Sequence, residues 1–271
     1  MRMDVKSMER YRRQLVLDGF GLEGQERLSR GRALIVGLGG LGSPSAMYLA
    51  AAGVGTIVLM DDDAVSLSNF NRQILFATDE LDRPKTLMAQ QRLNRFNPDI
   101  KVNTWHERLE DTTDPGVFAD FDVVLDCLDN LPSRLLLNRF CLGAKTPLVH
   151  GGVIRFYGQL MTIIPFEGPC LRCISPGSSF ACDCEKAGVL GPVAGVIGVM
   201  QALEAIKVLA DKGQKMTGRL LVFDGLRGTF EEVAVDRNPA CPDCGEFSTG
   251  LASALGNNGK PLTANKNSLK I

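Results

Sequence analysis

Glycine recurs early in the chain with the spacing of a phosphate-binding loop. Gly37, Gly39 and Gly42 fit the pattern G-x-G-x-x-G, and Gly40 adds a fourth glycine. Without side chains, backbone N–H groups can approach phosphate oxygens, and a helix that begins there adds partial positive charge. Asp61 follows about 20 residues later, where a carboxylate can bind ribose hydroxyls. The pattern predicts a nucleotide site and leaves open whether NAD, FAD or a nucleoside triphosphate binds.

Polar and charged side chains crowd the segment behind Asp61. They are Asp63, Asn69, Arg72, Gln73 and Lys85. Two cationic side chains and a further carboxylate suit a triphosphate with Mg²⁺ better than a hydride donor, which needs no such clamp. Arg72 and Lys85 could instead be ordinary solvated surface charges. We interpret the segment as favouring a triphosphate.

Asp129 directly follows residues 121–128, an apolar run that is typical of a buried strand. The carboxyl end of that strand should face the same crevice as Gly39. Because Mg²⁺ is bound mainly through oxygen ligands, Asp129 is a candidate metal ligand, directly or through water. The alternative is that Asp129 only caps the helix expected to begin near Leu131.

Four of the eight cysteines form two Cys-x-x-Cys pairs, Cys170 with Cys173 and Cys241 with Cys244. Together they offer four thiolates, the ligand set of a closed structural Zn²⁺ site without an open position for catalysis. Two metal-free reduced pairs, or a redox pair, are the alternatives. Neither pair opens a helix after a strand, as a thioredoxin-like site would.

Four cysteines lie outside these pairs. Cys127 and Cys141 occur on apolar faces of their elements, so we expect them in the core. Cys182 and Cys184 belong to a segment rich in Gly, Pro, Ser and Cys that is typical of a loop. Exposure and the nearby Lys186 favour thiolate reactivity at Cys184.

Composition and charge describe an ordinary globular protein. Of the 271 residues 45% are apolar and 23% charged, and the formal net charge is −1. This balance gives no reason to expect nucleic-acid or membrane binding. We find no signal-like segment and no apolar run of about 18 residues, so we expect a soluble cytoplasmic protein. Residues 187–209 come nearest, but Glu204 and Lys207 interrupt them.

The elements that would position the candidate residues alternate between strand and helix. Strands are expected at 32–36, 56–60, 101–104, 121–128 and 147–150, and helices at 43–52, 85–97 and 133–144. A strand, a glycine turn, a helix and a strand in about thirty residues make a βαβ unit. Later strands at 158–164 and 219–223 follow short glycine-containing turns and are expected to be antiparallel.

The predicted fold class is therefore α/β, with a doubly wound, mostly parallel Rossmann-like sheet extended by antiparallel strands and a structural zinc site. Residues 1–245 should form a single domain with an N-terminal helical segment. Residues 246–271 are small and polar, and we expect a disordered tail.

The order of the motifs resembles the ubiquitin-activating-enzyme superfamily, specifically the bacterial adenylyltransferases of thiamine and molybdopterin biosynthesis. Matching segments span residues 10–246. Besides the glycine loop and both cysteine pairs they are RYRRQ at 10–14, DDD at 61–63, SNFNRQ at 68–73, PK at 84–85, DCLDN at 126–130 and AGVLGP at 187–192. Each motif alone is weak, whereas the ordered set is highly specific.

This resemblance implies that ATP with Mg²⁺ binds at the glycine loop. The C-terminal Gly-Gly carboxylate of a small ubiquitin-like sulfur carrier would attack the α-phosphate, giving an acyl-adenylate and pyrophosphate. Asp61 would hold the ribose and Asp129 the metal, while Arg72, Gln73 and Lys85 would hold the phosphates. Asp63 and Asn69 would complete the nucleotide site.

The resemblance also implies roles for two further residues. Arg13 corresponds to an arginine supplied to the phosphates across a homodimer interface, with an exposed helix charge as the alternative. Cys184 corresponds to a crossover-loop cysteine implicated in sulfur transfer or in covalent contact with the carrier, with an incidental thiol as the alternative. Cys182 receives no role. A separate protein would donate the sulfur.

Two other functions remain as alternatives at this point. A dinucleotide-dependent oxidoreductase would bind NAD or FAD and would be insensitive to loss of Arg72 or Lys85. An inactive scaffold would bind a ubiquitin-like partner without catalysis, although the intact set of Asp61, Arg72, Lys85 and Asp129 argues against it. The biosynthetic pathway is left open.

Overall fold

The computed structural model describes residues 4–175 and 187–245. They form one eight-stranded sheet in the order β3-β2-β1-β4-β5-β6-β7-β8. The strands are β1 (Arg32–Val36), β2 (Thr56–Met60), β3 (Lys101–Trp105), β4 (Val123–Asp126), β5 (Leu148–Ile154), β6 (Tyr157–Ile163), β7 (Arg219–Asp224) and β8 (Thr229–Ala234). Neighbours from β3 to β5 pair in parallel, and β6, β7 and β8 add antiparallel pairs. The predicted α/β sheet with its antiparallel extension is confirmed.

Both faces of the sheet are buried at its centre, in β1, β2 and β4, as the apolar sequence of β1 requires. Successive side chains of a strand point to opposite faces. Ala33 and Ile35 accordingly belong to one apolar cluster, whereas Leu34 and Val36 belong to the other. The sheet therefore separates two cores.

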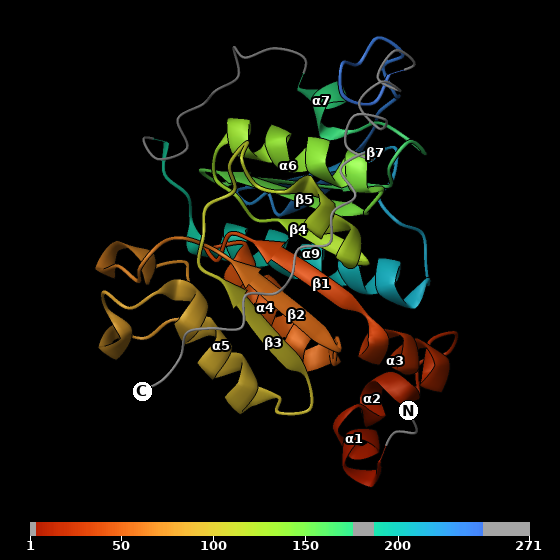
Figure 1. Cartoon of the computed structure of the whole chain (residues 1–271). Coiled ribbons are helices and arrows are strands. Elements are labelled where there is room, and N and C mark those ends of the chain that lie inside the picture. Colours follow the sequence, from red (N-terminus) through yellow and green to blue (C-terminus); the bar gives the residue numbers. More distant parts are fainter. Residues whose placement is uncertain (1–3, 176–186, 246–271) are drawn as a thin grey trace.

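Helices cover both faces (Figure 1). Residues of α3, α4, α5 and α9 contribute to the cluster on one face, and residues of α6, α7 and the 3-10 helix η3 contribute to the other. The helices are α1 (Val5–Arg10), α2 (Arg12–Leu15), α3 (Gly21–Arg30), α4 (Gly42–Ala52), α5 (Lys85–Phe96), α6 (Leu131–Ala144), α7 (Leu171–Ile174) and α9 (Gly191–Ala210), with 3-10 helices η1 (Leu67–Asn69), η2 (Thr78–Glu80) and η3 (Pro115–Asp120).

Helix α9 is long and apolar enough to cross a membrane, with a mean hydropathy of 1.7. It packs instead against α4 and the sheet. A Cβ atom at Gly198 would lie 2.4 Å from the Leu41 carbonyl oxygen, so the two helices approach as closely as glycine allows. Glu204, which interrupts the apolar run, is buried and accepts hydrogen bonds from the Thr162 hydroxyl and the Met216 N–H. We conclude that α9 is a core helix.

Strand β8 is absent from the elements predicted from sequence. All six of its residues are exposed, so no burial pattern marks it, and its pairing with β7 defines it. The predicted strand at 147–150 is longer in the structure and continues to Ile154. The tail predicted over residues 246–271 lies outside the described residues.

Candidate functional site

The glycine loop joins the end of β1 to the start of α4, as predicted. Gly37 has a positive φ of 93°, and a Cβ atom there would lie 2.6 Å from the Cys127 carbonyl oxygen. A Cβ atom at Gly42 would lie 2.0 Å from the Gly37 carbonyl oxygen, and one at Gly40 would lie 3.0 Å from Ala194. Gly39 differs, because the atom nearest to a Cβ added there would be Nε2 of Gln73, 3.8 Å away. Packing thus requires glycine at 37 and 42 and leaves little room at Gly40, whereas Gly39 leaves space for a ligand.

Asp61, at the end of β2, braces this loop. Its Oδ2 accepts the Leu38 N–H at 2.7 Å, and its Oδ1 accepts the Asp63 N–H at 2.8 Å. Burial raises the pKa of Asp61 above its usual range, although the Lys85 charge and the two N–H donors oppose the shift. Each carboxylate oxygen keeps acceptor capacity for a ribose hydroxyl.

Lys85 begins α5 and brings a buried ammonium group to the same region. Its side chain is only 4% exposed, and its Nζ lies 2.7 Å from Oδ2 of Asp63, which is 63% exposed. Buried lysines are rare unless they are paired. Here the partner, Asp63, faces solvent, so an anionic ligand could bind the Lys85 ammonium group beside Asp63 or in its place.

The segment around η1 presents Asn69, Arg72 and Gln73 with different roles. Asn69 caps η1 by accepting the Ser66 N–H at 3.1 Å, so its side chain is structural in this state. Half-buried Arg72 folds back through Nη1 onto the Ser68 carbonyl oxygen at 2.9 Å. Gln73 is 4% exposed, and no atom of the described residues bonds its Oε1.

An orphaned buried polar atom costs free energy unless a ligand or water satisfies it. The unpaired amide oxygen of Gln73 and the open space at Gly39 lie side by side, since the Gln73 amide is the nearest neighbour of that glycine. This arrangement fits a bound nucleotide.

Asp129 follows β4 and is exposed. Because β1 and β4 are adjacent and parallel, their carboxyl ends bring Asp129 to the same edge of the sheet as the glycine loop. The capping alternative for Asp129 is wrong, because Asn130 caps α6 by accepting the Ser133 N–H at 3.0 Å. The Asp129 carboxylate is therefore available to a ligand, with one contact to the Asn130 amide at 3.2 Å.

Arg13 lies far from this site within its own chain. The neighbouring Gln14 donates to the carbonyl oxygen of Ala52, the last residue of α4, whereas the glycine loop meets the first residue, Gly42. Eleven helical residues span roughly 16 Å. Arg13 is exposed, and within residues 4–175 and 187–245 it forms no ion pair. It could serve a nucleotide site only from another subunit.

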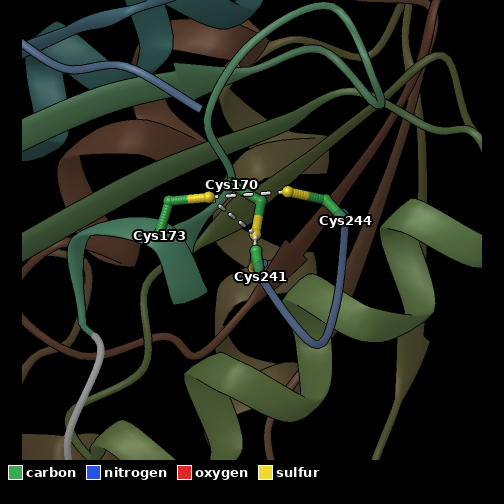
Figure 2. A group of neighbouring side chains, drawn as sticks. All are labelled: Cys170, Cys173, Cys241 and Cys244. Carbon is green, nitrogen blue, oxygen red and sulfur yellow. Dashed lines mark hydrogen bonds between the residues drawn. The ribbon is translucent and has the colours of Figure 1, made fainter. Parts of the chain in front are cut away.

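The four paired cysteines converge, as predicted. Figure 2 shows their sulfur atoms turned toward one another, from the short helix α7 on one side and a C-terminal loop on the other. Sulfur–sulfur distances are 3.9 Å for Cys170–Cys173, 3.7 Å for Cys170–Cys241 and 3.5 Å for Cys173–Cys244, and all four sulfurs lie within 4.8 Å of one another. Tetrahedral Zn²⁺ with bonds of about 2.3 Å separates its sulfur ligands by about 3.8 Å. The cluster fits a zinc ion.

Burial and hydrogen bonds shift the pKa values of the cluster's thiols in different directions. Burial raises the pKa of Cys170 and raises that of Cys244 to about 11. For Cys173 burial also raises the pKa, but N–H groups of Asn238 and Cys170 outweigh it and the net shift is downward. Without a cation, buried thiols at Cys170 and Cys244 stay protonated, and metal binding would release those protons.

Asn138, which sequence reasoning missed, joins α6 to both cysteine loops. It is fully buried. Its Oδ1 accepts the Leu171 N–H at 3.0 Å, and its Nδ2 donates to Asp243 at 3.1 Å. Each partner lies inside one Cys-x-x-Cys pair, so a single amide docks both halves of the cluster. An asparagine within an apolar helix was the only signal in the sequence.

The remaining cysteines divide into two groups. Cys127 and Cys141 are buried, and burial raises the pKa of both thiols, so their predicted core role is confirmed. Cys182 and Cys184 lie outside the described residues.

A buried polar network beneath Asp129 was also missed from sequence. The Asp126 carboxylate and the His150 ring contact each other at 2.7 Å and are 0% and 1% exposed. The Gln201 amide donates to the Asp126 and Val149 carbonyl oxygens at 2.8 and 3.1 Å, tying β4 to β5. Arg134 of α6 donates to the Leu128 carbonyl oxygen.

Comparison with known proteins identifies the family to which the chain is similar. Residues 11–243 match the ThiF family. The chain is 46% identical over 245 residues to the sulfur carrier protein ThiS adenylyltransferase of Escherichia coli K12, covering 90% of this chain and 97% of that protein. It is 44% identical to the molybdopterin-synthase adenylyltransferase of the same organism, covering 89% and 98%.

Solved structures agree on the fold. The crystal structure of E. coli MccB with ATP superimposes with a TM-score of 0.75 at 19% identity, covering 90% of this chain and 82% of that one. At that identity the likeness concerns the fold alone. The sequence match over most of its length decides the family: the chain belongs to the ThiF family.

Proposed function

We propose that this protein is an adenylyltransferase that uses ATP to activate the C-terminal Gly-Gly carboxylate of a ubiquitin-like sulfur carrier. The observation that carries the proposal is the gathering of the glycine loop, Lys85, Arg72 and Asp129 at one edge of the sheet of a ThiF-family chain. Relatives that match nearly their whole length are named sulfur carrier adenylyltransferases. A dinucleotide oxidoreductase would leave the cationic groups without a purpose.

The backbone of the glycine loop and the start of α4 would hold the phosphates. Asp61 would bind the ribose hydroxyls while it keeps its two N–H bonds. The Gln73 Nε2 would donate to a phosphate oxygen, and the unpaired Oε1, an acceptor, would accept from a nucleotide hydroxyl or from water. These contacts use groups already fixed by folding, so little ordering would be needed when ATP binds.

The reaction would join a carrier carboxylate oxygen to the α-phosphorus while the bond from that phosphorus to the β-phosphate bridging oxygen breaks. The electron pair leaves with pyrophosphate. A carboxylate is already ionised at neutral pH, so no general base is required. Lys85 and Arg72 would neutralise charge that develops on the phosphates.

Asp129 would hold Mg²⁺, which when bound neutralises phosphate charge and orients the triphosphate. Cys170, Cys173, Cys241 and Cys244 would hold Zn²⁺ with every position filled by the protein, which suits a brace between two loops. Reduced thiolates at that brace fit a cytoplasmic location.

Assembly and sulfur transfer would complete the activity. Arg13 lies too far from its own site to act there, so its proposed phosphate contact requires a homodimer in which it reaches the partner's phosphates. A separate protein would donate sulfur to the acyl-adenylate, and Cys184 would take part in the transfer or in covalent contact with the carrier. We propose no nucleic-acid or membrane partner. The thiamine and molybdopterin pathways both remain open.

ATP–pyrophosphate exchange tests the proposal. Labelled pyrophosphate should enter ATP when the E. coli sulfur carrier ThiS or a molybdopterin-synthase carrier subunit is added, and should not when the carrier lacks its Gly-Gly end. Binding of NAD or FAD without exchange would favour the oxidoreductase, and carrier binding without exchange would favour an inactive scaffold.

A further inference from the structure

Leu128, the residue that precedes Asp129, is held at both of its backbone polar groups. Arg134 donates through Nε and Nη2 to the Leu128 carbonyl oxygen, at 3.1 and 2.5 Å. The Leu128 N–H donates to Oδ1 of Asp126 at 3.1 Å. Both polar groups of Leu128 are therefore fixed by charged side chains, and such hydrogen bonds are stronger than neutral ones.

The anchor on the N–H side is rigid. Asp126 is fully buried, and its second oxygen contacts the His150 ring at 2.7 Å. The other ring nitrogen of His150 lies 3.1 Å from the Gln159 amide nitrogen. Since an amide N–H₂ can only donate, that ring nitrogen is the acceptor, and the remaining one donates to Asp126. This network fixes the carboxylate on which the Leu128 N–H depends.

The anchor on the carbonyl side belongs to the helix that follows. Arg134 lies in the first turn of α6, and its own N–H donates to the Asn130 carbonyl oxygen at 3.2 Å. The Asn130 side chain caps the same turn. Asp129 therefore lies between Leu128, whose backbone is held by Asp126 and Arg134, and Asn130, which caps α6.

Space around Arg134 is kept by Gly152. A Cβ atom there would lie 2.9 Å from Nε2 of Gln159 and 3.0 Å from Nη1 of Arg134, so a larger residue would crowd both side chains. The Cys127 carbonyl, one peptide earlier, lies against Gly37 of the nucleotide loop. The segment of residues 127–129 is therefore in van der Waals contact with the phosphate-binding loop.

We propose that Arg134 is a positioning residue, which holds the Leu128 peptide so that the Asp129 carboxylate is oriented toward the metal bound to ATP. This rests on the proposed function, specifically on Asp129 as the metal ligand. Arg134 acts through Asp129 and through no direct contact with the nucleotide. Residues that orient metal ligands typically change metal affinity by about 10–100-fold when they are removed.

The test measures the affinity of the full-length protein for ATP with EDTA and with saturating Mg²⁺, by calorimetry. The ratio of the two affinities is the metal-dependent gain. In Arg134→Met this gain should fall about 10-fold while metal-free ATP affinity stays within about 2-fold. Arg134→Lys, which can still donate to the carbonyl, should recover part of the gain and guards against misfolding of the methionine variant.

Two comparisons separate positioning from general damage. Arg139→Met removes an exposed arginine of the same helix, paired with Asp111 at 3.4 Å, and should change nothing. Asp129→Asn should lose the metal-dependent gain, and adding Arg134→Met to it should lose no more, because both act through one carboxylate.

The inference would be overturned if the metal-dependent gain were unchanged in Arg134→Met, or if the affinity for metal-free ATP fell as much as the gain. It would also be overturned if the losses added in the double variant with Asp129→Asn. A wild-type protein without any metal-dependent gain would overturn it too. Carrier-dependent exchange is measured separately. Its absence beside an intact gain would contradict the proposed function and leave the role of Arg134 standing.

Discussion

Replacing Lys85 by methionine should separate stability from catalysis. Lys85 carries a charge that is almost fully buried, while its partner Asp63 is largely exposed. Methionine keeps most of the apolar stem and removes the ammonium group. After the substitution Asp63 is not left as a buried unpaired charge, because water can solvate it. We therefore expect little change in stability.

The opposing free energies are of similar size. A charge-assisted hydrogen bond contributes about 1.5–3 kcal/mol to stability. Against it stands the cost of taking an ammonium group out of water, which is several kcal/mol before compensation. The net change in the free energy of unfolding should therefore stay within about 1 kcal/mol, or about 2–4 °C in Tm for a domain of this size. Loss of a cation from the phosphates should lower the exchange rate about 100–1000-fold.

The assay pairs a thermal melt with ATP–pyrophosphate exchange for wild type, Lys85→Met and Arg95→Met, the last an exposed cation near the end of the same helix. Arg95→Met should match the wild type in both. A Lys85→Met protein that melts far below wild type yet exchanges normally would refute the reasoning, since it would make the buried ammonium structural.

Three further outcomes are expected. Gly42→Ala should weaken ATP binding at least about 10-fold, because overpacking at 2.0 Å from the Gly37 carbonyl moves the loop, whereas Gly195→Ala, with open space around it, should leave the fold intact. Asn138→Ala should cost about 1–3 kcal/mol and speed zinc release to a chelator about 10–100-fold. Because the pKa of Asp61 is raised, its contribution to stability is present at low pH and is lost as pH rises through the folded pKa. ATP binding needs the ionised form, so affinity should fall as pH drops through that pKa, and titrations of Asp61→Asn should show no such fall.

Most of the sheet could be predicted from sequence because its signals are local. An apolar run between polar turns marks β1 and β2, and the predicted bounds of both, 32–36 and 56–60, agree with the structure. Strand β8 could not be predicted because none of its residues is buried. Its position depends on pairing with β7, which is a tertiary property.

The candidate site divides along the same line. The loop glycines and the paired cysteines have spacings that only a few kinds of site use. The glycines form the predicted turn between β1 and α4, and the four cysteines come together in one cluster, as predicted. Sequence could not decide whether Asp129 binds a metal or caps α6, since an aspartate side chain can accept a helix N–H. The supporting roles of Arg134 and Asn138 could not be read from sequence, because a lone arginine or asparagine on a helix acquires a role only through its tertiary partners.

The most direct measurement of the central claim is the mass of the sulfur carrier after incubation with this protein, ATP and Mg²⁺. We predict that E. coli ThiS, or a molybdopterin-synthase carrier subunit, gains one adenylyl group at its C-terminal carboxylate as pyrophosphate is released. A carrier whose C-terminus is amidated should gain none. Unmodified carriers, or adenylylation that persists on the amidated protein, would contradict the account.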